Sequence, residues 1–232
     1  MATTLNKIVY NILNLRYGGV TPDDTYLSER QIKHWIHTER AVLLQQELSK
    51  KRELPIQVVQ DLGCVPLDCV SIVECCDPSL SIGSDEFIGR TPELPIPLAF
   101  HYSVQGVNDL FTYVGLVDGT SIDLTSETIA LNSKYKKFTA TKRRAFYKNN
   151  RIYVTNPDGL ETINVRGIFT DPEEAAKFNH CSGDPCYTDD SIYPLMPYLE
   201  SPLIQLILSK YLNYSINPGL KDLDNDAKDS GQ

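Results

Sequence analysis

The side chains with the clearest potential for chemistry in this sequence are six cysteines, which could bind a metal ion or form disulfides. They fall into two clusters: Cys64, Cys69, Cys75 and Cys76, and then Cys181 and Cys186 next to His180. Structural zinc sites usually contain a Cys-x2-Cys pair, and neither cluster has one. The N-terminus lacks the features of a signal peptide, which predicts a reducing, cytoplasmic origin. We therefore expect thiols, no metal site and no cofactor, with zinc ligation and disulfides as the alternatives.

Two histidines, His34 and His37, lie three residues apart on a predicted helix and so share one side of it. The metalloprotease motif His-Glu-x-x-His requires a glutamate that is absent at this place. We interpret the pair as polar groups beside Trp35 at a packed edge of the helix. The whole chain contains four histidines, so few residues are available to build a histidine-based active site.

A patch of basic residues, interleaved with Tyr135 and Phe138, is the second candidate for binding: Lys134, Lys136, Lys137, Lys142, Arg143 and Arg144. Clustered cations with aromatic rings suit the phosphates and bases of nucleic acids. The whole chain, however, carries a net charge of -8 at pH 7, so its average field repels nucleic acid. We favour an acidic protein neighbour for this patch, and a merely solvated face is the alternative.

Catalytic motifs are missing from the sequence. Neither the G-x-x-x-x-G-K nor the G-x-G-x-x-G phosphate loop occurs, and there is no G-x-S-x-G nucleophile turn. Adjacent carboxylates such as Asp189 and Asp190 lie in a predicted turn, where such residues usually bond to the local backbone. We expect no catalytic residues and no enzymatic activity.

The elements that must position these residues begin with two helices. Apolar residues at helical spacing predict a first helix over residues 4–16, which Gly18 and Gly19 end. Ser28 with Gln31 fits a capping box, so a second helix is predicted from Ser28 to about Lys50. We expect the two helices to be antiparallel.

The middle of the chain has the features of strands and turns. Strands are predicted at 56–59, 70–73 and 162–169, with a long loop over 77–99. Asp118-Gly119 predicts a hairpin between 112–114 and 121–124, and Lys148-Asn149-Asn150 predicts a second between 145–147 and 151–154. One helical turn is predicted over 171–176, where acidic residues suit its N-terminus.

A last helix is predicted to begin with Ser201 as its N-cap and Pro202 at its first position. It is apolar on two sides, so we expect both sides to be buried, either against its own chain or against another subunit. It is far too short to cross a bilayer. The candidate interface residues are Leu203, Ile204, Leu206, Ile207, Tyr211 and Tyr214.

Helices followed by strands and then a helix indicate an α+β fold, in which the terminal helices pack as a small bundle beside a β-rich central unit. The expected divisions are an N-terminal helical hairpin over 1–55, a β-rich unit over 56–170, and a C-terminal helical segment over 171–220 that packs on the N-terminal helices. Residues 221–232 are expected to form a flexible tail.

Six blocks in fixed order carry a resemblance that covers roughly residues 5–212: HWIHTERAVLL, QDLGCVPLDCV, FTYVGLVDG, RAFYKNNRIYV, INVRGIFTDPEEAAKF and CYTDDSIYPL. In these blocks the chain resembles virion structural proteins of crAss-like bacteriophages of gut Bacteroidota, and most closely the portal-proximal ring proteins that act as head-to-tail adaptors. The order of the blocks is more specific than any one of them.

The resemblance implies a non-enzymatic structural protein that forms a closed homo-oligomeric ring of about 12-fold symmetry in the neck of the virion, assembled in the bacterial host cytoplasm. The ring would join the portal to the tail, contact adjacent tail or ring proteins, and let phage DNA pass through its lumen during genome ejection without specific binding. No membrane partner is implied. One alternative is a zinc-stabilised binding module that recruits a protein or nucleic-acid partner through the basic patch. An enzyme of the tail is a weaker alternative, because no paired-carboxylate or metal site supports it.

Overall fold

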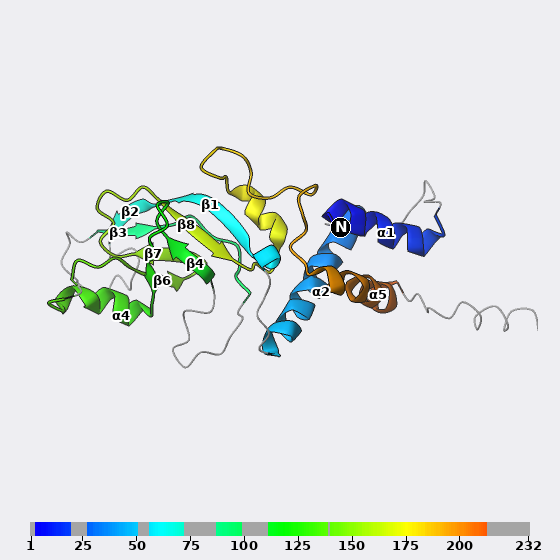
Figure 1. The fold of residues 1–232 in the computed structure, drawn as a ribbon, viewed down its shortest axis with the longest axis horizontal. Helices are drawn as coiled ribbons and strands as arrows, with labels where there is room; N and C mark the ends of the chain where they lie inside the picture. Colours follow the sequence, from blue (N-terminus) through cyan, green and yellow to red (C-terminus); the bar gives the residue numbers. More distant parts are fainter. Residues whose placement is uncertain are drawn as a thin grey trace, which may run out of the picture.

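The computed structural model describes residues 3–19, 27–50, 56–71, 87–98, 111–138 and 140–212. Three helices gather at one end of an elongated molecule, and the strands gather at the other end together with a short helix (Figure 1); we call these the helical end and the strand end. The fold is α+β, as predicted. Among the described residues, none of the helices is both long and apolar enough to cross a membrane.

Three helices form the helical end: α1 (Leu5–Tyr17), α2 (Glu29–Ser49) and α5 (Glu200–Tyr211). The Thr4 side chain accepts a hydrogen bond from the Lys7 N–H at the start of α1, and Gly18 ends this helix with φ of 66°. At the start of α2 the Ser28 hydroxyl accepts from the Gln31 N–H at 3.2 Å, as the capping signal predicted.

The predicted start of the last helix is wrong by a small margin. α5 begins at Glu200, with Leu199 rather than Ser201 at the N-cap position, and no side chain caps it. The reason is that the short 3-10 helix η4 (Pro197–Leu199) runs directly into α5, so the chain is already helical when it reaches Ser201.

Within the described ranges, eight strands form two sheets: β1 (Gln60–Pro66), β2 (Asp68–Ser71), β3 (Phe87–Arg90), β4 (Phe111–Gly115), β5 (Asp123–Leu124), β6 (Arg144–Lys148), β7 (Arg151–Val154) and β8 (Thr162–Gly167). The strand orders are β1-β8-β4 and β2-β3-β7-β6-β5. β1 continues past Leu67 into β2 and so joins the two sheets on one side. On the other side the Ile122 N–H donates to the Val114 carbonyl at 2.8 Å, next to a bridge between Gly115 and Ser121. The strands therefore follow a nearly closed circuit around the core.

Local signals predicted part of this sheet structure correctly. β6 and β7 form the expected hairpin, with φ of 51° at Asn149 and 57° at Asn150. β8 lies in the centre of its sheet, within the predicted strand at 162–169. The predicted helical turn is the 3-10 helix η3 (Pro172–Lys177), capped by the Asp171 side chain.

Other strand predictions are wrong. Residues 56–58 form the 3-10 helix η1 (Ile56–Val58) instead of a strand, because the partner strand β8 ends at Gly167, opposite Gln60. The predicted loop over 77–99 contains β3, which pairs with β2 and β7. The hairpin predicted at Asp118-Gly119 forms in part, with an antiparallel bridge between Gly115 and Ser121, but β5 itself pairs with β6 in parallel. β2 accounts for the strand predicted at 70–73 up to Ser71, and residues 72 and 73 lie outside the described chain.

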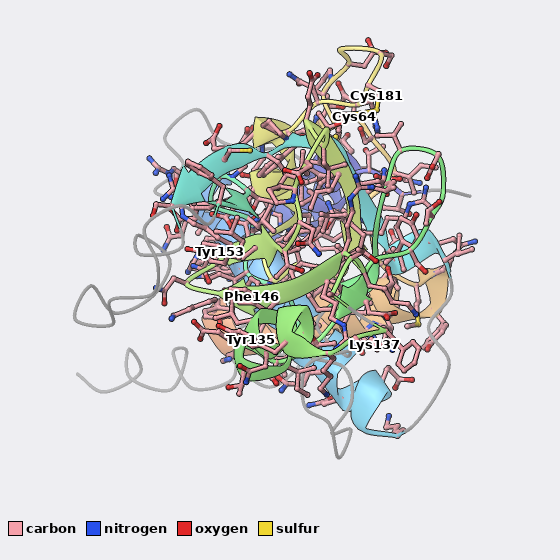
Figure 2. The ribbon with its side chains drawn as sticks, turned by 90° about the vertical axis from the view of Figure 1, so that its left-hand side faces the viewer. Cys64, Tyr135, Lys137, Phe146, Tyr153 and Cys181 are labelled. Atoms are coloured by element: carbon pink, nitrogen blue, oxygen red, sulfur yellow. A yellow bond between two sulfur atoms is a disulfide. The ribbon has the colours of Figure 1, made fainter. Side chains whose placement is uncertain are left out.

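The main hydrophobic core is continuous from the helical end into the strand end. It includes Leu5, Ile36 and Leu203 from the helices and Val65 and Ile163 from the strands, all with no exposed surface. A second, smaller cluster lies under the helix α4 (Glu127–Asn132), where the rings of Phe146 and Tyr153 stack at 5.1 Å (Figure 2). Since one core spans both ends, apolar side chains of each end are shielded from water partly by residues of the other end.

Candidate functional site: a polar junction between helices and strands

The described cysteines do not form a zinc site. Cys64 and Cys181 form a disulfide, with their Cα atoms 5.1 Å apart, which corrects the expectation that they are thiols. Cys69 is an exposed thiol and Cys186 a half-buried one, whereas Cys75 and Cys76 lie outside the described residues. Burial and the nearby Asp61 carboxylate raise the pKa of the Cys186 thiol to about 11.

A bulge in β1 at Gly63 explains how the two distant cysteines meet. Gly63 has φ of +65°, and an added Cβ would lie 2.6 Å from the Asn179 carbonyl oxygen, so only glycine fits there. The Cys64 N–H donates to the same carbonyl at 3.2 Å. The loop that carries Cys181 is thus held directly against β1, and the disulfide closes this contact at one edge of the strand end (Figure 2).

Arg40 of α2 is the central residue of the junction between the two ends. It is fully buried, and its Nε donates to the Pro194 carbonyl while Nη1 donates to the Phe169 carbonyl, each at 2.8 Å. Its guanidinium also lies 5.7 Å from the centre of the Tyr193 ring. Burial lowers the pKa of Arg40, and the neighbouring Tyr193 and Asp171 oppose that effect. A single side chain therefore connects α2 to the end of β8 and to the segment that leads to α5.

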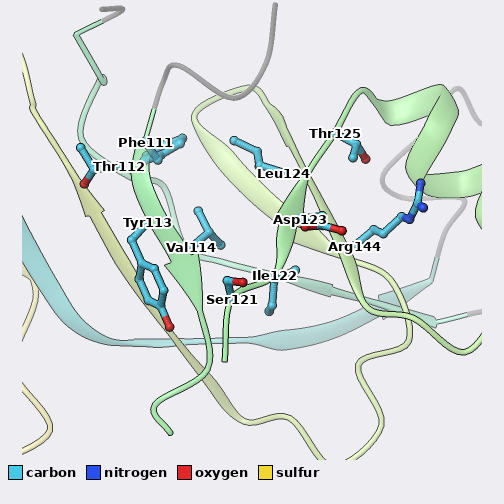
Figure 3. Close-up of a pocket in the computed structure, with 10 residues that line it drawn as sticks. All are labelled: Phe111, Thr112, Tyr113, Val114, Ser121, Ile122, Asp123, Leu124, Thr125 and Arg144. Carbon is cyan, nitrogen blue, oxygen red and sulfur yellow. The ribbon is translucent and has the colours of Figure 1, made fainter. Parts of the chain in front are cut away.

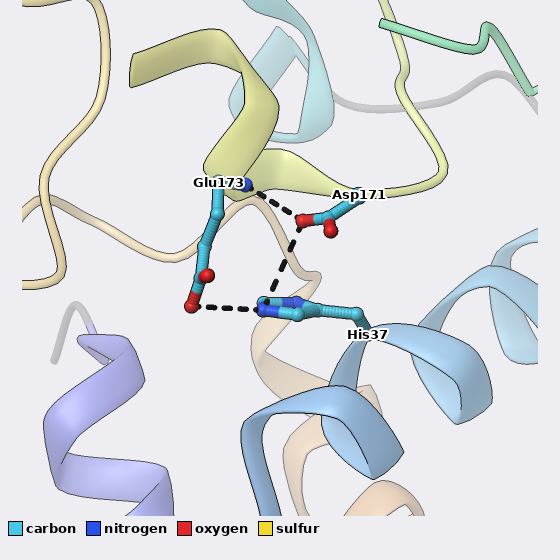
Figure 4. A group of neighbouring side chains, drawn as sticks. All are labelled: His37, Asp171 and Glu173. Carbon is cyan, nitrogen blue, oxygen red and sulfur yellow. Dashed lines mark hydrogen bonds and ion pairs between the residues drawn. The ribbon is translucent and has the colours of Figure 1, made fainter. Parts of the chain in front are cut away.

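His37 lies beside Arg40 and faces two carboxylates of the strand end (Figure 4). Its Nε2 is 3.2 Å from Glu173 Oε1 and 3.9 Å from Asp171 Oδ1, and its Nδ1 is 3.0 Å from the Tyr193 hydroxyl. Burial lowers the pKa of His37, against the opposing influence of Asp171 and Glu173. His34, expected to share this side of the helix, is exposed, so the two histidines do not form one site.

Glu39 holds α5 on α2. Its side chain is 2% exposed, and Oε1 accepts from Lys210 Nζ at 2.7 Å and from the Tyr211 hydroxyl at 2.6 Å. The Tyr211 ring stacks on Trp35 with 4.7 Å between the ring centres. Burial would raise the pKa of Glu39, but these hydrogen bonds outweigh it and the pKa is lowered.

An open groove of about 320 Å³ lies between β4 and β5 (Figure 3). Its titratable lining residues are Tyr113, Asp123 and Arg144, and no histidine, cysteine or second carboxylate lines it.

The comparisons with known proteins agree with one another. The family model described as phage tail ring protein 2 matches residues 7–230 of this chain. The chain belongs to this family. Ring protein 2 of Bacteroides phage crAss001 is 25% identical over 252 aligned residues, which cover 97% of this chain and 97% of that protein. The ring protein family is one of phage structural components, which favours a non-enzymatic role.

A ring protein of this family needs surfaces for its neighbours, and the predicted candidates divide between buried and exposed positions. On α5, Leu203 and Ile207 have no exposed surface and belong to the chain's own core, whereas Ile204, Leu206 and Tyr211 are partly exposed. Tyr214 lies outside the described residues. The candidate interface on this helix therefore narrows to the three partly exposed residues.

The basic patch of this ring protein also divides. Lys136, Lys137 and Lys142 are exposed, and the Lys134 side chain is outside the described atoms. Arg143 is partly buried and donates to the carbonyls of Asn156 and Asp158 at 3.3 and 3.0 Å, and Arg144 lines the groove. Arg143 thus bonds to its own chain and Arg144 lines the groove, whereas the exposed cations among the described side chains of the patch are Lys136, Lys137 and Lys142.

Sequence reasoning missed Arg40, Asp171 and Glu173 as members of a site. In the sequence Arg40 is one more charge on a helix, and Asp171 with Glu173 matches an ordinary helix start. A weak signal did exist, because position 40 follows Ile36 by four residues on the buried face of α2, where an arginine requires partners.

Proposed function

We propose that the chain is a non-enzymatic structural ring protein that joins the phage portal to the tail and forms part of the DNA conduit. The observation that carries this proposal is the match of the ring protein family over residues 7–230. The portal, adjacent tail or ring proteins and about 12-fold symmetry are the partners and geometry we propose. The ring would then lie in the neck of the virion, where its role is to provide surfaces complementary to the portal on one side and to the tail on the other.

Exposed apolar side chains at both ends of the molecule support ring formation. The first group, which we call the tip, comprises Tyr135, Lys136, Lys137 and Phe138 at the strand end, where Tyr135 is 75% and Phe138 86% exposed. The second group, the helical-end surface, comprises Tyr10, Ile192 and Tyr198, which are 62%, 64% and 56% exposed. A closed ring requires two different surfaces on every subunit, because each subunit contacts its neighbours head to tail. We propose that the tip of one subunit contacts the helical-end surface of the next.

Charge supports this arrangement. The tip carries Lys136 and Lys137, and the helical end carries Asp190 and Glu200 close to Ile192 and Tyr198 in the sequence. A basic, aromatic tip suits an acidic protein neighbour. The net charge of -8 in turn suits a lumen through which DNA slides without adhering.

Native mass spectrometry and electron microscopy of the purified chain, alone and mixed with portal protein, test the ring proposal. We expect a ring of one defined copy number, formed by the chain alone or on the portal. A chain that stays monomeric in both preparations would overturn it.

A double variant tests the proposed contact. Tyr135→Ser with Phe138→Ser removes the apolar part of the tip, and we expect the ring fraction to fall at least about tenfold, since these rings are the exposed aromatic anchors. Val117→Ser, at a residue that is 57% exposed in the turn before β5, is the matched control and should leave the ring intact. Rings of normal stability from the double variant would show that the tip is not the contact.

A second candidate function is not favoured. The zinc-stabilised module needed the cysteine clusters, and two of the described cysteines are bonded to each other.

A further inference from the structure

Three side chains at the junction bring metal-binding atoms together from elements far apart in the sequence. His37 lies on α2, Glu173 lies on η3, and Asp171 is the N-cap residue of η3 (Figure 4). Their ligand atoms all lie within 4.8 Å of one another. One imidazole nitrogen and two carboxylate oxygens form a donor set that suits zinc and similar divalent ions.

The second observation is that two of these atoms are buried without an aligned hydrogen-bond partner. His37 is 6% exposed, and neither its Nε2 nor Glu173 Oε1 makes a hydrogen bond within the described chain. The two atoms are 3.2 Å apart, close enough for an ion pair. Buried polar atoms without a hydrogen bond are costly, and a cation bonded to both atoms would satisfy them together.

The two separations from His37 Nε2 are close to those expected around one ion. Zinc bonds to nitrogen and oxygen ligands are about 2.0–2.2 Å long, which places adjacent ligands of a tetrahedral site roughly 3.3–3.6 Å apart. The observed 3.2 and 3.9 Å from His37 Nε2 to the two carboxylates lie close to this range. The carboxylate side chains are 45% and 39% exposed, so water can reach a fourth position.

We propose that His37, Asp171 and Glu173 bind one divalent ion of the zinc type. The Tyr193 hydroxyl, 3.0 Å from Nδ1, fixes the orientation of the imidazole, as second partners of ligating histidines commonly do. Two cations lie near the site: Lys33 pairs with Asp189, and Arg40 bonds two backbone carbonyls through Nε and Nη1, while its Nη2 has no hydrogen-bond partner within the described chain. The bound ion connects α2 to η3 and so fastens the helical end to the strand end.

Cobalt binding to the EDTA-treated full chain tests the site, because Co²⁺ reports its ligands by absorption and the free thiols are possible competitors. We expect one equivalent of Co²⁺ with the visible bands of nitrogen and oxygen ligands, no thiolate charge-transfer band, and displacement by Zn²⁺. Glu173→Gln should weaken binding by more than about 10–100-fold, because loss of a direct ligand exceeds the loss of a second partner. Glu174→Gln, one residue along the same 3-10 helix, should bind as the unaltered chain does.

A stability measurement gives an independent readout. Zn²⁺ should raise the melting temperature of the unaltered chain, of Glu174→Gln and of His34→Ala, and it should not raise that of Glu173→Gln. Zn²⁺ should likewise not raise the melting temperature of His37→Ala. If His37→Ala does not fold, the result for Glu173→Gln is the test. Absence of saturable binding, equal affinity of Glu173→Gln, or a thiolate band that Cys69→Ser or Cys186→Ser removes would overturn the proposal. His37 and Glu173 would then be a plain ion pair.

Discussion

At the scale of single residues, the junction depends on charged side chains whose partners are backbone carbonyls. Arg40 reaches acceptors that lie 129 and 154 residues further along the chain. Arginine suits this task because its planar fork donates in two fixed directions at once, which lysine cannot do.

We therefore expect Arg40→Lys to lower the free energy of unfolding by about 2–4 kcal/mol, since at least one buried carbonyl loses its charged donor. Urea denaturation followed by circular dichroism measures this change. Arg30→Lys, at an exposed position of the same helix, should change stability by no more than about 0.5 kcal/mol. Equal stability of the two variants would show that the Arg40 contacts contribute little.

The cysteines give a second prediction at this scale. With a pKa of about 11, Cys186 remains a neutral thiol at pH 8, where only about one molecule in a thousand is the reactive thiolate. Iodoacetamide at pH 8 should therefore label the exposed Cys69 much faster than Cys186, and labelling of Cys186 should accelerate as the pH rises toward 11. Peptide mapping by mass spectrometry measures both rates in one sample. Rapid labelling of Cys186 at pH 8 would contradict its burial.

At the scale of elements, the disulfide fixes the loop after η3 to β1. The bond joins residues 117 positions apart, so it constrains the unfolded chain strongly. We expect reduction, or Cys181→Ser, to lower the free energy of unfolding by about 2–5 kcal/mol. Denaturation with and without reductant measures the difference, and Cys69→Ser is the control because that thiol is exposed and unbonded. A reductant-insensitive midpoint would mean that the contacts of Gly63 and Asn179 suffice.

The contact between α2 and α5 allows the contributions of a hydrogen bond and of a ring stack to be measured separately. Tyr211→Phe retains the stack on Trp35 but removes the hydrogen bond to Glu39, and it should cost about 1 kcal/mol because the tyrosine is partly exposed. Tyr211→Ala removes both interactions and should cost about 1 kcal/mol more. Equal effects of the two variants in thermal denaturation would show that the stack contributes nothing.

Elements with local signals were predictable from the sequence, and elements defined by distant partners were not. The hairpin of β6 and β7 follows from Asn149 and Asn150, which tolerate the left-handed backbone, and α2 begins where Ser28 caps it. β3 had no such signal, because only its pairing with β2 and β7 makes it a strand. The same distinction applies to the site. Spacing could place His37 on a helix, but only the fold brings Glu173 to it.

At the scale of the whole molecule, both ends of the described chain meet at the helical end. The Thr3 hydroxyl donates to Glu200 at 2.6 Å, and Arg16 donates to the Leu212 carbonyl at 3.3 Å. Within the described chain, the contacts that hold α5 are made by residues up to Leu212. A chain that stops at Leu212 should therefore keep the stability of the full chain, whereas one that stops at Leu199 should lose the cooperative unfolding of its helical end.

Limited proteolysis and thermal denaturation distinguish these two chains. The shorter one should be cut within α1 or α2, because the apolar face that α5 covers is left open to solvent. Protection of both helices in the shorter chain would show that α5 is dispensable for the fold.

The meeting of α1, α2 and α5 has a consequence for synthesis. α1 and α2 precede the strands in the chain and their apolar partner α5 follows them, so the helical end is completed only after the β-rich middle has been synthesised. A prematurely terminated product lacks this finished end. Such a product leaves the apolar faces of α1 and α2 uncovered, and exposed apolar surface of this kind favours aggregation.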